Sequence, residues 1–428
     1  MGRKQRRKES FRIVSRWFYR IAVTIFKPLF MGYFRVKAVN ASIIPRYGPA
    51  IVISNHVNLF DPIWVYIMAN RPVYFVATED LFRRRFIGIL VRWFGGFPKR
   101  KSANDFRAMH NIFNTVKRGG LVGIFPEGSR TWDGLNGEIV PTIAKLIRKL
   151  KVPVYVCNLE GGYLAYPRWA KWWRRIPVRG IFSQLYTKET IPEDDDTILA
   201  DIRRAIKNRD YELDIDTGRH NYKHLAVDIT KVLYRCPVCG TMEGLKVVHP
   251  YGKNMVECSS CFSAWRVTVD ARLEPLDETG KPEEIRIPLY QYAERVRNMP
   301  LVPIRTEINL PLEEGEVVYL RSRPRFLLIE ERFPNVRVLA FGRAFLTNRH
   351  LIFRTRIGIP LEADLKLVEA LSVDPGDRLH FVYKGILYRI PFKRESVVKW
   401  YDTITRLKDR LTQNEQKNNT YHPRASSL

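Results

Sequence analysis

The segment PAIVISNHVNLFDPIW, residues 49–64, decides the fold of the first half of the chain. It begins with a short apolar run, which is the pattern of a strand buried in a sheet. Asp61 and Pro62 then form a typical helix start, with Asp as the N-cap and Pro at the first helical position. The segment therefore predicts a strand, a loop that carries His56, and a helix.

His56 and Asp61 are the first candidates for chemistry, because the predicted loop allows their side chains to meet. On one continuous helix, five residues turn about 140° beyond a full circle, and the two side chains would point apart. A histidine held on the loop beside Asp61 can take a proton from an alcohol, while the carboxylate fixes its tautomer and favours the imidazolium. The alternative is an ordinary helix cap beside a loop histidine that has no role.

The alternation of strands and helices continues to about residue 190. The apolar runs AIVIS, PVYFVA, GLVGIFP and VPVYVCNL predict buried strands, and the segments DPIWVYIMA, DFRAMHNIFNTVKR and PTIAKLIRKL predict helices between them. This order predicts an α/β domain with a mostly parallel sheet and flanking helices. Functional residues gather where the strands of such sheets end, which is where ISNHVNLFDP and GIFPEGSR lie.

The composition supports two or three domains with hydrophobic cores, since 45% of the 428 residues are hydrophobic and 12% are aromatic. The net charge of +28 favours an anionic partner, which is a nucleic acid, an acidic membrane surface or a phosphorylated substrate. No run approaches the roughly 18 uncharged apolar residues of a membrane span, and no signal-peptide cleavage site is recognisable. Arginine at position 6 leaves the N-myristoylation pattern incomplete.

The N-terminal segment, residues 1–34, starts with MGRKQRRK and continues with a helical pattern in which arginines recur every fourth residue from Arg12 to Arg20. On a helix these arginines share one face. We expect an amphipathic helix that lies on an anionic membrane surface; the alternative is a basic tail followed by a core-packing helix. The aromatic residues expected in the lipid boundary are Trp17, Phe18 and Phe26.

Two further loops carry groups that suit anions. FPEGSRTWDG, residues 125–134, follows a predicted strand; Gly128 allows close backbone approach, with its N–H facing an anion, and the planar fork of Arg130 suits a phosphate. Glu127 is equally consistent with an acid at a helix start. GGFPKRKS, residues 95–102, joins paired glycines to three consecutive cations, and its alternative is a solvated basic loop.

In order, His-x4-Asp, a Gly-rich basic segment, Phe-Pro-Glu-Gly-Ser-Arg and Val-Pro-Val resemble the four blocks of the glycerolipid acyltransferases of the PlsC, or lysophosphatidate acyltransferase, type. The resemblance covers about residues 35–190. It implies transfer of an acyl group from acyl-CoA or acyl-carrier protein to a hydroxyl of a glycerol phosphate or lysophospholipid. No Ser or Cys stands beside His56 as a nucleophile, which agrees with direct attack by a substrate hydroxyl.

The resemblance also implies roles for individual residues. His56 is the general base and Asp61 orients it. The second block usually supplies a phosphate-binding arginine, but FPKRKS lacks the acid that often precedes it, so either Arg100 or Lys101 takes that place. The residues that match the acceptor-binding third block are Glu127, Gly128, Ser129 and Arg130. The segment YLAYPRWAKWWRRIPVR interleaves basic and aromatic residues in a way that favours a membrane interface.

Four cysteines form two CxxC pairs with 18 residues between them, and they fit a tetrahedral zinc site of four thiolates. Short strands predicted in LKVVHP and AWRVTV suggest a zinc ribbon, in which four cysteine ligands leave no open position, so the zinc would be structural. The alternative is two disulfides or a redox pair. Cys157 lies in a predicted strand and is expected to be a core thiol. The four predicted ligands are Cys236, Cys239, Cys258 and Cys261.

From about residue 300 the pattern changes to short alternating strands closed by the helix SVVKWYDTITRLKDRL. GRAFLTNRHLIFRT and KGILYRIPFKRESVVKWYDTI resemble a GRAM or PH-like domain, which implies a lipid or protein partner; the alternative is a packing module. The predicted organisation is a basic amphipathic segment (1–34), a PlsC-like acyltransferase domain (35–210), a helical linker (211–233), a four-cysteine zinc ribbon (234–270), a linker (271–309), a GRAM/PH-like domain (310–412) and a disordered tail (413–428).

The sequence thus predicts an O-acyltransferase, peripheral or monotopic on the cytoplasmic face of a membrane, that forms phosphatidate from lysophosphatidate. The first alternative is acylation of glycerol 3-phosphate or another lysophospholipid. An alternative from a different class is a lipid-surface or nucleic-acid binding protein. Nucleic acid is disfavoured, because basic residues concentrate in the N-terminal arm and the acyltransferase region, while the predicted ribbon is only mildly basic.

Overall fold

The computed structural model describes residues 14, 16–83, 85–99, 106–215, 222–248, 254–305, 310–332, 335–374 and 377–420. The chain forms two compact units. The first contains the described residues of 1–227, 248–256 and 264–290, and the second contains those of 228–247, 257–263 and 291–428. Most of the predicted basic arm, and both candidates of the second block, Arg100 and Lys101, lie outside the described residues.

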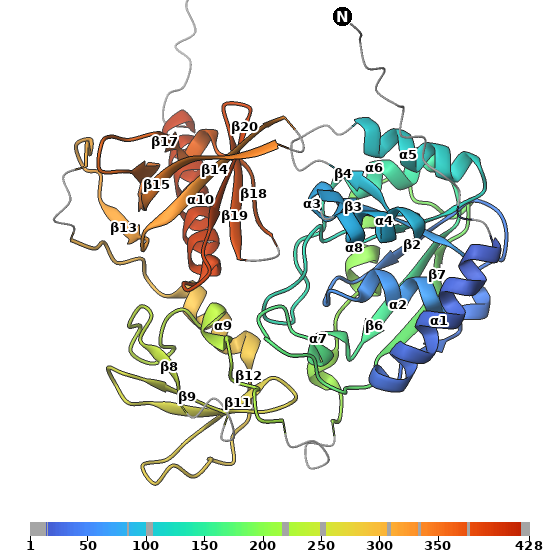
Figure 1. Ribbon diagram of the computed structural model, residues 1–428, viewed down its shortest axis with the longest axis horizontal. Helices are drawn as coiled ribbons and strands as arrows, with labels where there is room; N and C mark the ends of the chain where they lie inside the picture. The colour runs from blue at the N-terminus through green and yellow to red at the C-terminus, as the bar shows by residue number, and fades with distance from the viewer. Residues whose placement is uncertain are drawn as a thin grey trace, which may run out of the picture. The chain divides into compact units, whose positions relative to one another are not determined.

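The first unit is built around a seven-stranded sheet (Figure 1). All neighbouring strands are parallel except one antiparallel pair, β6 with β7, so the predicted mostly parallel α/β sheet is confirmed. In spatial order the strands are β1 (Lys37–Val39), β7 (Arg179–Tyr186), β6 (Val154–Glu160), β2 (Ala50–Ser54), β5 (Leu121–Ile124), β3 (Val73–Thr78) and β4 (Phe97–Lys99).

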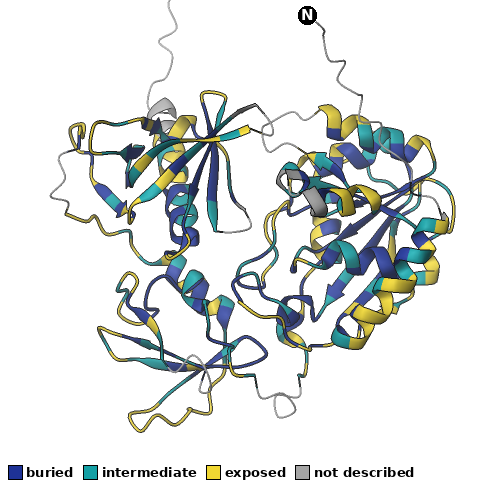
Figure 2. Ribbon diagram, viewed as in Figure 1, coloured by how far each residue is buried: buried dark blue, intermediate teal, exposed yellow. Residues whose placement is uncertain are grey.

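Helices flank this sheet, and the central strand β2 is buried along its whole length (Figure 2). A strand covered on both faces must be apolar throughout, which explains the uninterrupted run AIVIS. The helices of the unit are α1 (Arg16–Phe34), α2 (Asp61–Met68), α3 (Glu79–Arg83), α4 (Arg85–Trp93), α5 (Phe106–Lys117), α6 (Thr142–Leu150), α7 (Gly162–Ala165) and α8 (Asp195–Ala205), followed by the 3-10 helix η2 (Asp210–Glu212).

Helix α1 packs one face on the unit and leaves the other in solvent. Trp17 is 73% exposed, whereas Phe18 and Phe26 are half-buried with their rings 6.3 and 5.3 Å from the ring of Phe94. Of the three aromatic side chains expected in a lipid boundary, Trp17 is therefore exposed and the other two are half-buried. Among the described helices, none combines the length and apolar character that crossing a bilayer requires.

A five-stranded sheet follows, and it contains the short strands predicted beside the cysteine pairs. Residues 271–309, predicted as a linker, carry two of its strands and the helix α9 (Leu289–Asn298). The described part of the predicted helical linker 211–233 holds only the end of η2 and the 3-10 helix η3 (Ile229–Lys231). The strand order is β12 (Ile287–Pro288), β11 (Arg272–Pro275), β10 (Ala264–Val267), β9 (Met255–Cys258) and β8 (Leu245–Val248).

The second unit contains an eight-stranded antiparallel sheet and the helix α10 (Val397–Thr420), so the predicted β-rich region closed by one helix is confirmed. Trp400 and Ile404 of α10 are fully buried. The helix continues to Thr420, past residue 413, at which a disordered tail is predicted. The strands are β17 (Leu361–Asp364), β16 (His350–Arg354), β15 (Asn335–Thr347), β14 (Arg325–Arg332), β20 (Ile386–Pro391), β19 (Arg378–Tyr383) and β18 (Glu369–Asp374), with β13 (Val318–Arg321) paired to β15 and η4 (Leu365–Leu367) between β17 and β18.

Candidate functional site

The loop between β2 and α2 brings His56 and Asp61 together as predicted. His56 Nδ1 lies 2.8 Å from Asp61 Oδ2. Asp61 is not the N-cap of α2, however, because the helix starts at Asp61 itself with Phe60 before it, and Pro62 is the second helical residue. The carboxylate turns back to the loop that precedes it instead of capping its own helix.

The contacts of Asp61 assign the proton on the imidazole. Oδ2 also accepts the backbone N–H groups of Val57, at 2.7 Å, and Asn58, at 2.8 Å. Because a carboxylate oxygen that accepts two N–H groups acts as an acceptor, we infer that His56 Nδ1 carries a proton and donates a third hydrogen bond to it. Nε2 is then the basic nitrogen of His56. Burial raises the pKa of the Asp61 carboxyl, and the N–H groups of Asn58 and Val57 oppose that rise.

His56 is held from its other side by the third block. Its ring stacks on Phe125 with centroids 4.3 Å apart, and Phe125 stacks on Phe75 at 5.2 Å. Burial lowers the pKa of His56 well below its ordinary value, and the positive charges of Arg130 and Arg168 lower it further. The imidazole is therefore neutral at neutral pH, which is the form that a general base requires.

Glu127 accepts a hydrogen bond from the backbone of the loop that carries His56. Its Oε1 accepts the His56 N–H at 2.9 Å and an N–H of the Asn136 side chain at 3.2 Å. Its Oε2 accepts the Gly137 N–H at 2.7 Å. Burial raises the pKa of Glu127 to about 7, against the opposing effect of these donors. The family resemblance implies a role of Glu127 in acceptor binding, and the structure adds a backbone contact with the candidate base.

The remaining residues of the third block lie at the surface beside this pair. Gly128 has a positive φ of 66°, but its N–H donates to the Phe125 carbonyl at 3.1 Å, so the expectation that this N–H faces an anion is wrong. The N–H instead closes the turn that carries the block. Ser129 is exposed and Arg130 is half-buried, and the charge of Asp61 stabilises the Arg130 guanidinium, whose pKa is lowered by burial.

Sequence reasoning missed three polar residues that support the site. Asn58 Nδ2 donates to the Gly162 carbonyl at 2.7 Å and so ties the His56 loop to α7. Asp210 is fully buried and accepts the N–H groups at the start of α7. Burial raises the pKa of its carboxyl to about 7. Arg168 donates to the third block. Asn58 lies in the opening segment and Arg168 in the basic and aromatic run of residues 163–179, whereas no signal surrounds Asp210.

Comparison with known proteins supports this description. Residues 35–160 match the family model described as Acyltransferase. The matched region contains His56, Asp61 and the third block, whereas Arg168, Asp210 and the four paired cysteines lie outside it.

Two curated relatives share part of this region. A probable 1-acyl-sn-glycerol-3-phosphate acyltransferase of Mycoplasma genitalium is 25% identical over 160 residues, which are 36% of this chain and 55% of the relative. A 1-acyl-sn-glycerol-3-phosphate acyltransferase of Borreliella burgdorferi is 28% identical over 109 residues, which are 25% of this chain and 43% of the relative. The chain thus spans about half the length of these relatives.

A solved structure is also similar to part of the chain. It is the crystal structure of the 1-acyl-sn-glycerophosphate acyltransferase PlsC from Thermotoga maritima, with 21% sequence identity and a TM-score of 0.39. The similarity covers 44% of this chain and 76% of that chain.

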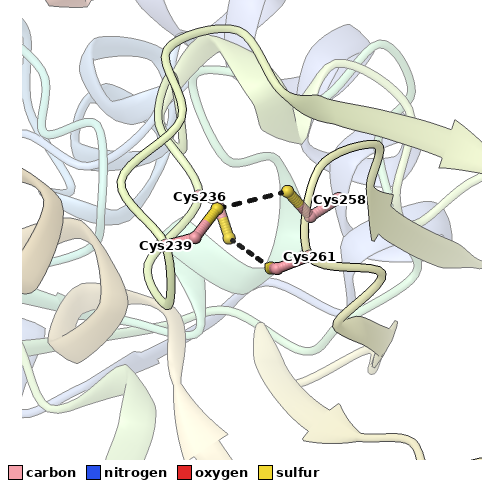
Figure 3. A group of neighbouring side chains, drawn as sticks. All are labelled: Cys236, Cys239, Cys258 and Cys261. Atoms are coloured by element: carbon pink, nitrogen blue, oxygen red, sulfur yellow. Dashed lines mark hydrogen bonds between the residues drawn. The ribbon is translucent and has the colours of Figure 1, made fainter.

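Outside the acyltransferase match, the four paired cysteines gather as predicted (Figure 3). All four Sγ atoms lie within 4.8 Å of one another, and Cys236 with Cys261 and Cys239 with Cys258 are 3.7 Å apart. These separations exceed the roughly 2.05 Å of a disulfide bond. They match a tetrahedral site, in which thiolates about 2.3 Å from a zinc ion are about 3.8 Å apart. Cys157 is separate from the cluster and fully buried in β6, as predicted for a core thiol.

Each cysteine pair forms a tight turn of the same design. In both turns the backbone N–H two residues after the first cysteine points to its Sγ, at 3.4 Å for Cys236 and 3.4 Å for Cys258. The turns close at residues with positive φ, Gly240 at 75° and Phe262 at 58°. N–H groups aimed at sulfur favour the thiolate that a metal ion binds. The geometry of the two turns is therefore compatible with metal coordination.

Proposed function

We propose that the protein is an O-acyltransferase that transfers a fatty acyl group from acyl-CoA or acyl-carrier protein to the hydroxyl of lysophosphatidate, forming phosphatidate. The observation that carries this proposal is the 2.8 Å contact of His56 Nδ1 with Asp61 Oδ2 inside a region that matches the acyltransferase family. The names of both curated relatives support the choice of acceptor.

In the proposed reaction, His56 Nε2 takes the proton of the acceptor hydroxyl as its oxygen attacks the thioester carbonyl. Asp61 stabilises the imidazolium that forms. The thiolate leaves when the tetrahedral intermediate collapses, and the imidazolium returns the proton to it. Cys157 is unsuited to act as a covalent nucleophile, because it is fully buried and burial raises the pKa of its thiol. Direct attack by the acceptor is therefore the simplest route.

We propose that the phosphate of the acceptor binds to the cationic groups beside His56. Arg130 is the supported candidate, because it lies close enough to lower the pKa of His56. A guanidinium presents paired N–H donors that match the oxygens of a phosphate. A contribution from Arg100 or Lys101, and from Gly128 and Ser129, stays a prediction from the sequence.

We also propose that the enzyme lies on the anionic cytoplasmic face of a membrane, as a peripheral or monotopic protein. The exposed face of α1 supports this, since Trp17, Ile25 and Leu29 are each more than 60% exposed and Arg20 lies among them. Such a mixture of large apolar and basic side chains suits the boundary between head groups and acyl chains. A lysophospholipid acceptor is met at the same boundary.

For the second unit we propose a structural zinc ion held by Cys236, Cys239, Cys258 and Cys261, and a GRAM/PH-like domain that contacts a lipid or protein partner. Zinc in such a site stabilises the fold without taking part in acyl transfer, because four thiolates leave no open coordination position. The arrangement of the four sulfur atoms supports the zinc site.

The experiment that tests the function measures thiol release from acyl-CoA and from acyl-carrier protein by the full chain. The acceptors are lysophosphatidate, glycerol 3-phosphate, a second lysophospholipid, and none, each with the wild-type protein and with His56→Ala. Release that requires both lysophosphatidate and His56 supports the proposal. Release with another acceptor moves the assignment to that acceptor, and absence of His56-dependent release with every acceptor overturns it.

A further inference from the structure

Arg168 lies outside the region that matches the acyltransferase family, yet it forms hydrogen bonds with the third block, residues 125–130. It follows α7 in the chain, and its NH1 group donates to Ser129 Oγ at 2.9 Å and to the Arg130 carbonyl at 2.7 Å. Its guanidinium also lies 4.2 Å over the ring of Trp132. Two hydrogen bonds and a stacked aromatic ring fix the orientation of this cation.

The position of Arg168 is close to the candidate base. Thr131, in the segment that Arg168 contacts, donates its N–H to the His56 carbonyl at 3.1 Å. The charges of Arg168 and Arg130 both lower the pKa of His56, which agrees with the place of Arg168 on the segment that Thr131 ties to His56. Two cations near a half-buried histidine oppose its protonation. An anion bound beside them would be attracted by both charges.

We propose that Arg168 and Arg130 together bind the phosphate monoester of the acceptor beside His56 Nε2, so that Arg168 determines selectivity for phosphate-bearing acceptors. This inference rests on the proposed function, which supplies a phosphorylated acceptor. The planar guanidinium offers N–H donors in pairs that match two phosphate oxygens, and a fixed orientation lowers the entropy that binding costs. A phosphate group of acyl-CoA has the same chemistry, and the experiment separates the two sources.

The test compares Arg168→Gln with wild type and with Arg204→Gln, which removes an equal charge from α8, where the side chain is 80% exposed. Acceptors are lysophosphatidate and a monoacylglycerol of the same chain that lacks the phosphate. Arg168→Gln is expected to raise KM for lysophosphatidate by about tenfold or more, the effect of losing a hydrogen bond to a charged group. KM for the acyl donor and turnover of monoacylglycerol are expected to stay within about twofold, as are all values for Arg204→Gln.

A binding measurement without turnover keeps this inference distinct from the proposed function. Equilibrium binding of glycerol 3-phosphate is expected to weaken by the same factor in Arg168→Gln and to be unchanged in Arg204→Gln. If no acceptor supports His56-dependent transfer, the proposed function fails while this measurement still decides the role of Arg168. Unchanged binding, or a rise confined to KM for the acyl donor, overturns the inference.

A second variant guards against loss of folding. Arg168→Lys keeps the charge over Trp132 but loses the planar fork, and it is expected to raise KM for lysophosphatidate less than Arg168→Gln does. A purely structural role would instead lower the thermal stability of both variants and reduce kcat equally for both acceptors. That result also overturns the inference.

Discussion

The His56–Asp61 pair and the four-cysteine cluster are assembled in different ways. The cluster consists of two turns of the same local design, each of which points a backbone N–H at its own first cysteine. The pair depends on contacts with residues far away in the chain, such as Glu127, 71 positions from His56, and Gly162, 104 positions from Asn58. A local pattern therefore suffices to predict the cysteine cluster. A local pattern also predicts the His56–Asp61 pair, but not the distant residues that hold its loop in place.

The surroundings of the two sites differ as well. The first cysteine turn is tied to α10 within the second unit, because Lys399 Nζ contacts Glu243 Oε1 at 2.5 Å and Glu395 Oε1 at 2.6 Å. Tyr234, just before the turn, donates to Asp402 of the same helix at 3.1 Å. The His56 site lies wholly within the first unit. Substitutions in the four-cysteine cluster should therefore lower the stability of the second unit, and substitutions of His56 or Asp61 should lower the rate of the proposed acyl transfer.

The largest expected effect is on stability, from removal of the proposed zinc by chelation or by Cys258→Ser. Structural zinc sites of this kind have apparent binding free energies of about 10–16 kcal/mol, so the second unit should lose its cooperative unfolding transition. Zinc content and hydrogen exchange in α10 measure this. Cys157→Ala, which removes a thiol outside the cluster, should keep one zinc per chain. Unaltered exchange in α10 after complete metal loss would contradict the structural role.

The next largest effect is on turnover, from His56→Ala. Loss of a general base lowers kcat by about 10²- to 10⁴-fold. The measurement is thiol release at saturating substrates, with zinc content and unfolding temperature as checks on the fold. His110→Ala, which changes an exposed histidine of α5, should keep wild-type activity. Residual activity above a tenth of wild type would show that another group takes the proton.

Glu127 should make the stability of the first unit depend on pH. Its pKa rises from 4.5 to about 7 on folding, so the native state holds a proton that the unfolded state releases between these values. Stability contributed by this group is therefore present below pH 4.5 and falls as pH rises to 7, by about 3 kcal/mol. Urea unfolding at pH 5 and pH 8 measures the change, and Glu127→Gln should remove it. An equal pH dependence in both proteins would refute this source.

The sequence predicts the contact of His56 with Asp61 and the cysteine cluster because their signals are local. His56 and Asp61 stand at the end of an apolar strand and the start of a helix, and the cysteines are two CxxC pairs. By contrast, no sequence pattern near Asp210 predicts that its carboxylate accepts the N–H groups of Gly161 and Tyr163, almost 50 residues earlier in the chain. Such contacts depend on which segments the sheet brings together, which local periodicity does not contain.

The same limit explains the wrong details. The N–H of Gly128 was expected to face an anion, because glycine permits close approach, but the turn that it closes uses that N–H internally. The polar sequence after residue 413 predicts a disordered tail, but α10 continues to Thr420, because the buried face of the helix at Trp400 and Ile404 anchors it. Tertiary packing decides both cases.

Asp61→Asn sharpens the comparison, because it separates charge from position. All three contacts of Asp61 with donors go to Oδ2, and Oδ1 accepts no hydrogen bond from the described residues. An amide oxygen can replace Oδ2, so Asn should keep the orientation of His56 and lose only the stabilisation of the imidazolium. We expect kcat to fall by up to about 10⁴-fold in Asp61→Asn, and Asp61→Ala to lose more, because alanine also removes the orientation. Equal losses in the two variants would mean that charge alone matters.

The smallest expected effect is a shift of the pH profile. Among the described residues, Asp61 contacts the ring of His56, Glu127 accepts its backbone N–H, and Arg130 and Arg168 act on it through their charges. Burial and the two arginines hold the pKa of His56 below its ordinary value of 6.5. Because the base must be neutral, kcat/KM should stay high at pH 6.5 and fall only as pH drops through the lowered pKa. Arg168→Gln removes one positive charge and should move this acid limb upward, towards 6.5, by up to about one unit. Cys258→Ser should leave the limb unmoved, since the cluster lies in the other unit. A wild-type midpoint above 6.5 would show that the negative charge of Asp61 outweighs burial and both arginines at this histidine.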